Sequence, residues 1–153
     1  MSIPQSGGGL IEHYGQLAEY LNAGCKPKED WKIGTEHEKF GYVKDSFAPL
    51  PYDGRCSIKA MLQGLRDTYN WSEILEGGNI IGLTKEGANV SLEPGGQLEL
   101  SGAPLDSIHE TCDEVNQHLS EVRDIADKIG AGFLGLGAAP EWSHEEMPMM
   151  PKG

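Results

Sequence analysis

Two carboxylate side chains, those of Glu93 and Glu99, lie in one short stretch, residues 91–102, which reads SLEPGGQLELSG. Alternate residues of a β-strand point to opposite faces, so Glu93, Gln97 and Glu99 share one face and the leucines between them share the other. The sequence Pro94-Gly95-Gly96 supplies a fixed φ followed by two residues free to adopt positive φ, as a tight reversal requires. We therefore predict a hairpin with two carboxylates on one surface. A solvent-facing polar strand is the alternative.

A second stretch, residues 31–43 (WKIGTEHEKFGYV), also alternates with period two. It places Glu36 and Glu38 on one face and directs Lys39 to the other. Four carboxylates on neighbouring strands repel one another, which raises their pKa values or attracts a cation. Oxygen ligands without cysteine or histidine favour Mg²⁺ over zinc. The pattern indicates a magnesium site, and magnesium commonly accompanies a phosphorylated substrate such as ATP.

The helices and strands predicted around these side chains indicate an α+β fold, in which helices flank an antiparallel sheet. Strand-like runs separated by turn-forming residues indicate a meander over residues 71–75, 80–84, 88–93 and 97–101, and a buried strand is predicted at 133–137. Amphipathic helices are predicted from Leu10 to Gly24, from an N-cap at Ser57 to Tyr69, and from a capping box at Ser107 to Gly130. Cys112 lies on the apolar stripe of the last helix, so we expect it to pack as a small apolar residue.

Composition narrows the class of protein. The chain has 153 residues, the size of one domain, and 24 acidic against 12 basic residues give a net charge of −12. No Lys/Arg cluster occurs, which argues against nucleic acid and anionic membranes as partners. No apolar run is long enough to span a membrane and no secretory signal precedes the first helix, so we expect a cytoplasmic protein. The three cysteines are widely spaced and indicate neither a zinc site nor a disulfide framework.

Other motifs carry less weight. Residues 130–135 fit G-x-G-x-x-G, but they follow a helix and open a strand, the reverse of a dinucleotide-binding loop. No zinc-protease motif or G-x-S-x-G nucleophile elbow occurs. A carboxylate-lined metal-binding module, or a hydrolase that uses two glutamates as acid and base, stays open as an alternative to phosphate chemistry.

Longer strings carry a resemblance. With GTEHEKFGY (34–42), NIIGL (79–83), SLEPGGQLELSGAPL (91–105) and GFLGLG (132–137), the chain resembles glutamate–cysteine ligases of the plant and proteobacterial type, over nearly its whole length. The resemblance implies a glutamine-synthetase-like carboxylate–amine ligase whose antiparallel sheet forms the floor of the active-site cleft. It implies that ATP and Mg²⁺ join the γ-carboxylate of L-glutamate to the amine of L-cysteine through γ-glutamyl phosphate, the first step of glutathione biosynthesis.

The resemblance also assigns residues. Glu36 and Glu38 match the family's Glu-x-Glu metal pair, Glu93 and Glu99 match the acidic positions of its hairpin, and Gln97 is a neighbour that lines the cleft. The expected organisation is a flexible segment over residues 1–9, followed by residues 10–153 as the N-terminal part of a catalytic domain that is truncated at its C-terminus. Basic groups for phosphate and glutamate are expected in the missing part, so this chain alone is expected to be inactive.

Two details of the resemblance concern single positions. Ala138-Ala139 stands where bulkier residues are expected in the family. Cys112 matches a position that forms a redox-linked disulfide in some relatives, and its partner would lie beyond Gly153.

Overall fold

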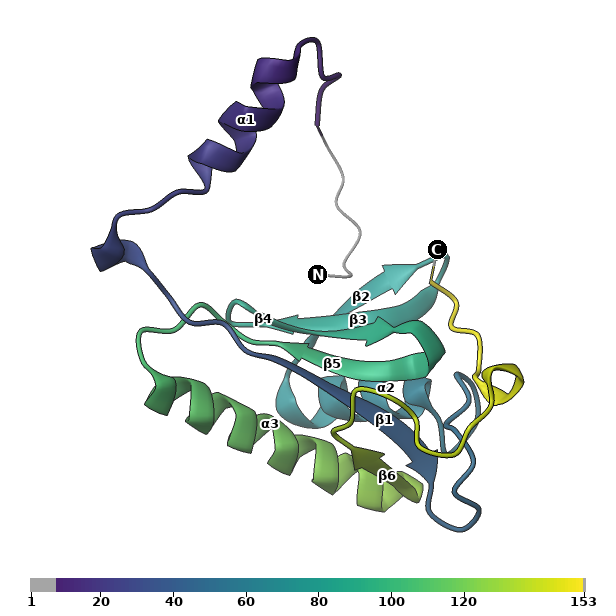
Figure 1. The fold of residues 1–153 in the computed structure, drawn as a ribbon. Coiled ribbons are helices and arrows are strands. Elements are labelled where there is room, and N and C mark those ends of the chain that lie inside the picture. The colour runs from purple at the N-terminus through teal and green to yellow at the C-terminus, as the bar shows by residue number, and fades with distance from the viewer. Residues whose placement is uncertain (1–7, 153) are drawn as a thin grey trace.

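Six β-strands form one antiparallel sheet in the order β2-β3-β4-β5-β1-β6. The computed structural model describes residues 8–152, so most of the segment predicted to be flexible, residues 1–9, lies outside the described residues. The strands are β1 (Glu36–Val43), β2 (Ser72–Glu76), β3 (Asn79–Lys85), β4 (Ala88–Glu93), β5 (Gln97–Ser101) and β6 (Ala131–Leu134). Strands β2 to β5 form the predicted meander, and β1 joins it beside β5 (Figure 1).

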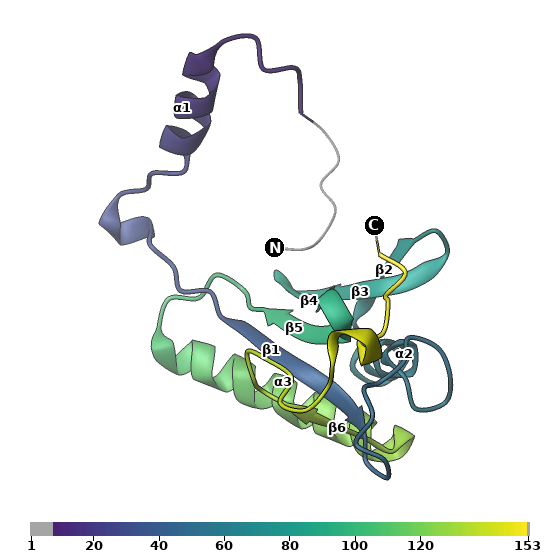
Figure 2. The same cartoon turned by 45° about the vertical axis from the view of Figure 1, so that its right-hand side comes forward.

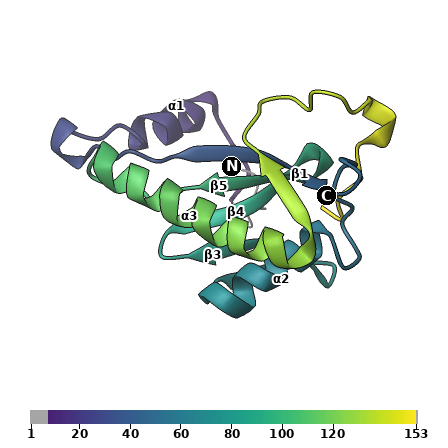
Figure 3. The same cartoon turned by 90° about the horizontal axis from the view of Figure 1, so that it is seen from below.

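Two helices, α2 (Ile58–Tyr69) and α3 (Ile108–Ile129), cover one face of this sheet (Figure 3). Leucines from α2 and branched residues from α3 pack with the inward leucines of β4 and β5 in one hydrophobic core. Leu62, Leu65, Leu98 and Leu100 are at most 1% exposed, so the apolar side of the hairpin is the core side. The α+β class with an antiparallel sheet and flanking helices is confirmed.

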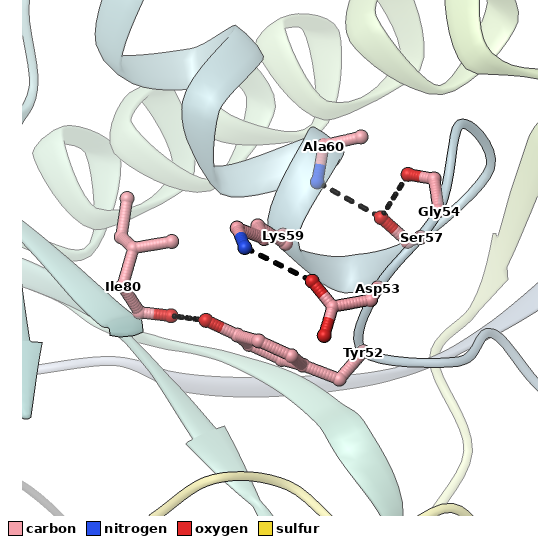
Figure 4. A network of polar contacts seen from close by, with 7 residues as sticks. All are labelled: Tyr52, Asp53, Gly54, Ser57, Lys59, Ala60 and Ile80. Atoms are coloured by element: carbon pink, nitrogen blue, oxygen red, sulfur yellow. Dashed lines mark hydrogen bonds and ion pairs between the residues drawn. The ribbon is translucent and has the colours of Figure 1, made fainter. Parts of the chain in front are cut away.

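The start of α2 is fixed by the predicted N-cap. The Ser57 Oγ accepts a hydrogen bond from the Ala60 N–H at 3.1 Å and donates one to the Gly54 carbonyl at 2.8 Å (Figure 4). Beside it, the Tyr52 hydroxyl donates to the Ile80 carbonyl on β3 at 3.0 Å. Serine at this position satisfies one of the free amides of the first turn, and the tyrosine ties the preceding loop to the sheet.

Gly64 allows α2 and α3 to approach each other. A Cβ at this position would lie 2.5 Å from the Cγ2 of Ile125, a buried residue of α3. We expect Gly64→Val to lower the free energy of unfolding by about 2–3 kcal/mol, because the methyl groups must push α3 outward. Urea unfolding measures the effect. Thr68→Val, on the exposed side of the same helix, should change it by less than about 0.5 kcal/mol; equal losses in both variants would contradict the close packing.

Helix α3 begins and ends as predicted, but the side of the helix that packs against the sheet is not the predicted one. Ser107 Oγ accepts from the Glu110 N–H, and Gly130 ends the helix with φ of 82°. Cys112 is exposed, so the prediction that it packs as an apolar residue is wrong. The face that α3 turns to the sheet is centred further along the helix, at His118, Val122 and Ile125, and Cys112 lies outside it.

The N-terminal region differs most from the sequence-based expectations. Helix α1 (Tyr14–Ala23) begins four residues later than predicted and has no buried residue, so its apolar stripe packs against nothing in the described part of the chain (Figure 2). A short 3₁₀ turn, η1 (Lys28–Asp30), follows. Residues 31–35 lie outside β1 and contact the sheet region through the Ile33–Leu105 bridge and through a hydrogen bond from the Gly102 N–H to the Thr35 carbonyl at 2.6 Å. The last predicted strand, 133–137, is shifted to β6, which pairs with β1.

Candidate active site on the open face of the sheet

The face of the sheet that α2 and α3 leave uncovered, here called the open face, carries all five predicted site residues. Strand register places Glu38 of β1 directly opposite Glu99 of β5, and Glu93 of β4 opposite Gln97 of β5. Glu36 lies two residues before Glu38 and therefore on the same face. Three adjacent strands thus bring together side chains that are up to 63 positions apart in the sequence, from Glu36 to Glu99.

These side chains differ in how firmly they are held. The Glu99 carboxylate is 3% exposed and its Oε2 accepts a hydrogen bond from the Ser91 hydroxyl at 2.8 Å. Glu36 and Glu38 are exposed, and the Gln97 amide approaches the Glu38 Oε2 at 3.5 Å. Glu99 is therefore a fixed carboxylate at the centre of the face, while Glu38 opposite it can rearrange around a ligand. The sequence analysis assigned no role to Ser91, the donor of this hydrogen bond.

Residues 135–152, here called the strap, cross the open face after β6 (Figure 1). The ring of Trp142 packs edge-on against Phe40 of β1, with ring centroids 5.8 Å apart. After a short turn, η3 (His144–Glu146), the strap reaches the β4–β5 turn η2 (Pro94–Gly96), where Met147 and Met150 occupy the space a Cβ would fill on Gly95 and Gly96. Both glycines also have positive φ, a conformation that favours glycine. Glycine is therefore needed at this turn both for its backbone conformation and to leave room for the two methionines.

The strap brings a cation to the site. The Lys152 ammonium donates a hydrogen bond to the Leu92 carbonyl of β4 at 2.7 Å. A cavity of about 330 Å³ lies between this end of the strap and the hairpin, and both Lys152 and Glu93 line it. The sequence analysis missed Lys152 because it lies 59 positions after Glu93, and a pattern of neighbouring residues cannot predict a contact over that separation.

A second cavity, of about 430 Å³, lies beside the first part of the strap. It is lined by Glu36, His37 and Glu38 of β1 and by residues 135–137. The two cavities place space for a ligand next to three of the four predicted carboxylates.

No group of three or more His, Cys, Asp or Glu side chains in residues 8–152 is arranged to hold a metal ion. Without a bound cation, mutual repulsion favours carboxylates that lie apart from one another. Mg²⁺ commonly takes only one or two protein carboxylates and completes its shell with water and substrate phosphates. The facing pair Glu38 and Glu99 fits that requirement.

A buried lysine lies beside a histidine on the helix side of the same strands. Lys39 is 1% exposed, and its ammonium donates to the His37 carbonyl at 2.7 Å and lies 3.0 Å from the His37 Nδ1. Burial lowers the pKa of Lys39 to about 8, although the charges of Glu99 and Glu38 oppose the shift. Strand alternation correctly predicted that Lys39 points away from the carboxylates. Lys39 pairs with Leu98 of β5 and therefore lies on the same face as this core residue, so its burial could also have been predicted.

His118 of α3 extends this buried polar region. It is 3% exposed, and neither ring nitrogen has a hydrogen-bond partner. Burial, and then the charges of Lys39 and His37, lower the pKa of His118 to about 3. Sequence reasoning missed it, although its spacing from Val115 and Val122 places it on the apolar stripe of the helix.

This buried imidazole predicts acid sensitivity. Between pH 6.5 and about 3 the unfolded chain binds a proton that the folded chain excludes, so the free energy of unfolding falls as pH is lowered through this window. We expect His118→Leu to remove about 3 kcal/mol of the loss between pH 7 and pH 4. Urea unfolding at both pH values measures it, with His109→Leu on the exposed side of α3 as control. An unchanged pH dependence in His118→Leu would show that the imidazole is charged in the fold.

A family model described as "Glutamate-cysteine ligase family 2 (GCS2)" matches residues 32–153 of this chain. The chain belongs to this family. Its relatives include glutamate–cysteine ligase A of rice (Oryza sativa subsp. japonica), 51% identical over 137 residues, and the glutamate–cysteine ligases of Medicago truncatula and Arabidopsis thaliana, 50% and 49% identical. Each alignment covers 90% of this chain but only 26–27% of the relative. The glutamine-synthetase-like fold expected from the sequence is consistent with membership of the GCS2 family.

The expected cytoplasmic location is wrong when judged against these relatives, because every one compared is named as a chloroplastic enzyme, which points to a plastid. The expectation rested on the lack of a secretory signal and of an apolar span, and neither feature separates cytoplasm from plastid. Among the described residues, every helix is too short or too polar to cross a membrane.

Proposed function

We propose that this chain supplies the carboxylate-bearing floor of a glutamate–cysteine ligase active site, in which ATP activates glutamate before cysteine attacks. The observation that carries the proposal is the position of Glu36, Glu38, Glu93 and Glu99 on one open face of the sheet, with Glu38 opposite Glu99. The relatives are named glutamate–cysteine ligases, which supports the joining of glutamate to cysteine, and the activation of glutamate by ATP is part of the proposal. Residues 10–153 are, in this proposal, the N-terminal part of a longer catalytic domain.

The proposed roles of the four glutamates and Gln97 follow from how firmly each side chain is held in place. Glu99, fixed by Ser91, and the movable Glu38 are the proposed pair of metal ligands, and Glu36 and Glu93 flank them at the two cavities. Bound Mg²⁺ would neutralise the triphosphate and the charge that develops during phosphoryl transfer. Gln97, between Glu93 and Glu38, is proposed to line the cleft and to donate a hydrogen bond to a bound ligand.

Lys152 supplies the positive charge that an acidic floor lacks. Its ammonium reaches the hairpin from the strap and lines the same cavity as Glu93. We assign it to an anionic group of the substrates, a phosphate or a carboxylate, because a cation facing developing negative charge stabilises the transition state. The strap therefore closes one side of the cleft and contributes to its chemistry.

A chimera tests the proposal. Rice ligase A, with the segment that matches this chain replaced by the aligned residues of this chain, keeps the remainder of a ligase around the open face. The chimera should release phosphate from ATP only when both Mg²⁺ and glutamate are present, and should form γ-glutamylcysteine when cysteine is added. Turnover without nucleotide or metal would instead indicate a hydrolase that uses two carboxylates as acid and base.

A further inference from the structure

A third cavity, of about 240 Å³, lies between the strap and the β6 end of the open face, and we call it the aromatic pocket. Its floor is Phe40 and Tyr42 of β1, which continue the alternation that points Glu38 to the open face. Leu134 of β6 is paired with Phe40 and lies on the same face. The rest of the lining comes from the loop after β1 and from the strap, as Phe47, Pro140, Glu141 and Trp142.

Four aromatic rings line the aromatic pocket, and they form two pairs. Trp142 packs edge-on against Phe40, and Phe47 stacks on Tyr42 with ring centroids 5.9 Å apart and an interplanar angle of 30°. The Trp142 indole also donates a hydrogen bond to the Phe47 carbonyl at 2.9 Å, which joins the strap to the loop after β1. The walls of the pocket are therefore held in place by contacts within the protein.

The apolar lining of this pocket is accessible from outside. The side chain of Phe47 is 68% exposed and that of Leu134 is 45% exposed. Phe47 has a φ of 57°, a left-handed conformation that is rare for a bulky side chain. Backbone strain of this kind is concentrated at ligand-binding sites, where the surrounding structure holds a residue in an unfavourable conformation. An exposed ring held in this way offers a ligand a surface on which to stack.

The size and the lining of the aromatic pocket favour a single planar ring system. Its volume is below the range of about 300–1,000 Å³ that encloses drug-sized ligands. Nucleobases stack on aromatic side chains through their π-faces. Within the described part of the chain, Glu141 is the one charged residue of the lining. Because a carboxylate offers only acceptors, it favours a ring that carries an exocyclic amino group.

The position of the aromatic pocket matches that of the proposed metal ligands. Phe40 follows Glu38 by two residues, which is about 7 Å along a strand, and Tyr42 lies about 7 Å further on. A nucleotide laid along β1 can therefore place its phosphates at Glu38 and its base in the pocket. The cavity at Glu36 and Glu38 and the aromatic pocket follow one another along the same face of this strand.

We propose that the aromatic pocket holds the adenine ring of ATP. The ring lies against Phe47 and Trp142, and its 6-amino group donates a hydrogen bond to the Glu141 carboxylate. The ribose leads back along β1 toward Glu38, where the phosphates meet the proposed metal ion. This inference rests on the proposed ligase function, which supplies the nucleotide, and it assigns Phe47 and Glu141 to recognition of the base.

The first test uses adenosine, which needs neither metal nor turnover. The ¹⁵N-labelled 153-residue chain is titrated with adenosine while NMR follows the indole N–H signals. The Trp142 signal, assigned by its loss in Trp142→Phe, should shift saturably with a dissociation constant on the order of 1 mM. The indoles of Trp31 and Trp71 donate to Lys26 and Glu121 outside the pocket and should not shift. Purine riboside, in which hydrogen replaces the 6-amino group, should bind about tenfold more weakly.

Two variants of the same chain test the assigned residues. Phe47→Ala should weaken adenosine binding about tenfold, the scale of one lost stacking contact, whereas Tyr20→Ala, an exposed aromatic residue of α1, should leave it unchanged. Glu141→Ala should bring the affinities for adenosine and purine riboside within about twofold of each other. Glu145→Ala, the same change at another exposed position of the strap, should preserve their difference. The thermal midpoint of each variant confirms folding.

The rice chimera separates this inference from the proposed function. In it, Phe47→Ala should raise KM for ATP about tenfold, and the loss should appear in KM rather than in kcat, because the base is held equally in the ground state and the transition state. An active chimera whose KM for ATP is unchanged by Phe47→Ala would overturn the pocket and leave the ligase function standing. A chimera that forms no γ-glutamylcysteine would overturn the function, and the adenosine titration would then decide the pocket alone. No saturable shift of Trp142, or equal affinity for adenosine and purine riboside, would overturn the inference.

Discussion

Replacing Glu99 by glutamine in the rice chimera is expected to lower kcat for γ-glutamylcysteine formation by about 10³-fold, the scale of losing one group that stabilises transition-state charge. Glutamine keeps the shape and can still accept the hydrogen bond from Ser91, so the loss reports the missing charge. The thermal midpoint should change little, because the relief of repulsion with Glu38 is offset by the loss of attraction to the buried Lys39 ammonium.

The control for this variant is Glu29→Gln, on the exposed turn η1 away from the sheet. It should leave activity within about twofold of the unmodified chimera, as expected for a surface substitution. Full activity in Glu99→Gln would remove the central carboxylate from the proposed metal pair.

Replacing Lys152 by methionine in the same chimera is expected to lower kcat/KM by about 10²-fold, because methionine preserves the stem but removes the cation that faces the anionic substrate. Lys128→Met is the matched control, since Lys128 is an exposed lysine of α3 that pairs with Asp124 on the helix side. Steady-state kinetics with ATP and glutamate varied separately show which substrate loses affinity. Equal, small effects in both lysine variants would show that Lys152 only anchors the strap at Leu92.

Much of the open face could be predicted because it depends on strand alternation. Once the hairpin forms at Pro94-Gly95-Gly96, period two places Glu93 and Glu99 on one side whatever the rest of the chain does. The direction of Lys39 follows in the same way. Capping chemistry is equally local, which explains why Ser57 and Gly130 marked helix ends correctly.

The rest depends on contacts between distant segments. The alignment of Glu38 with Glu99 requires β1 to pair with β5, and the sequence does not state which strands are neighbours. Lys152 reaches Leu92 only because the strap folds back over the sheet. The burial of His118 and the exposure of Cys112 are set by how far α3 is rotated against the sheet, and a broad apolar stripe tolerates several rotations.

The position of the metal tests the central claim most directly. Crystals of the chimera grown with Mn²⁺ in place of Mg²⁺ and a non-hydrolysable ATP analogue would reveal the ion by its anomalous scattering. We predict Mn²⁺ on the open face, bound to carboxylate oxygens of Glu38 and Glu99 and to phosphate oxygens of the nucleotide. Mn²⁺ and nucleotide bound elsewhere, with the four carboxylates of the open face free of metal, would contradict the account.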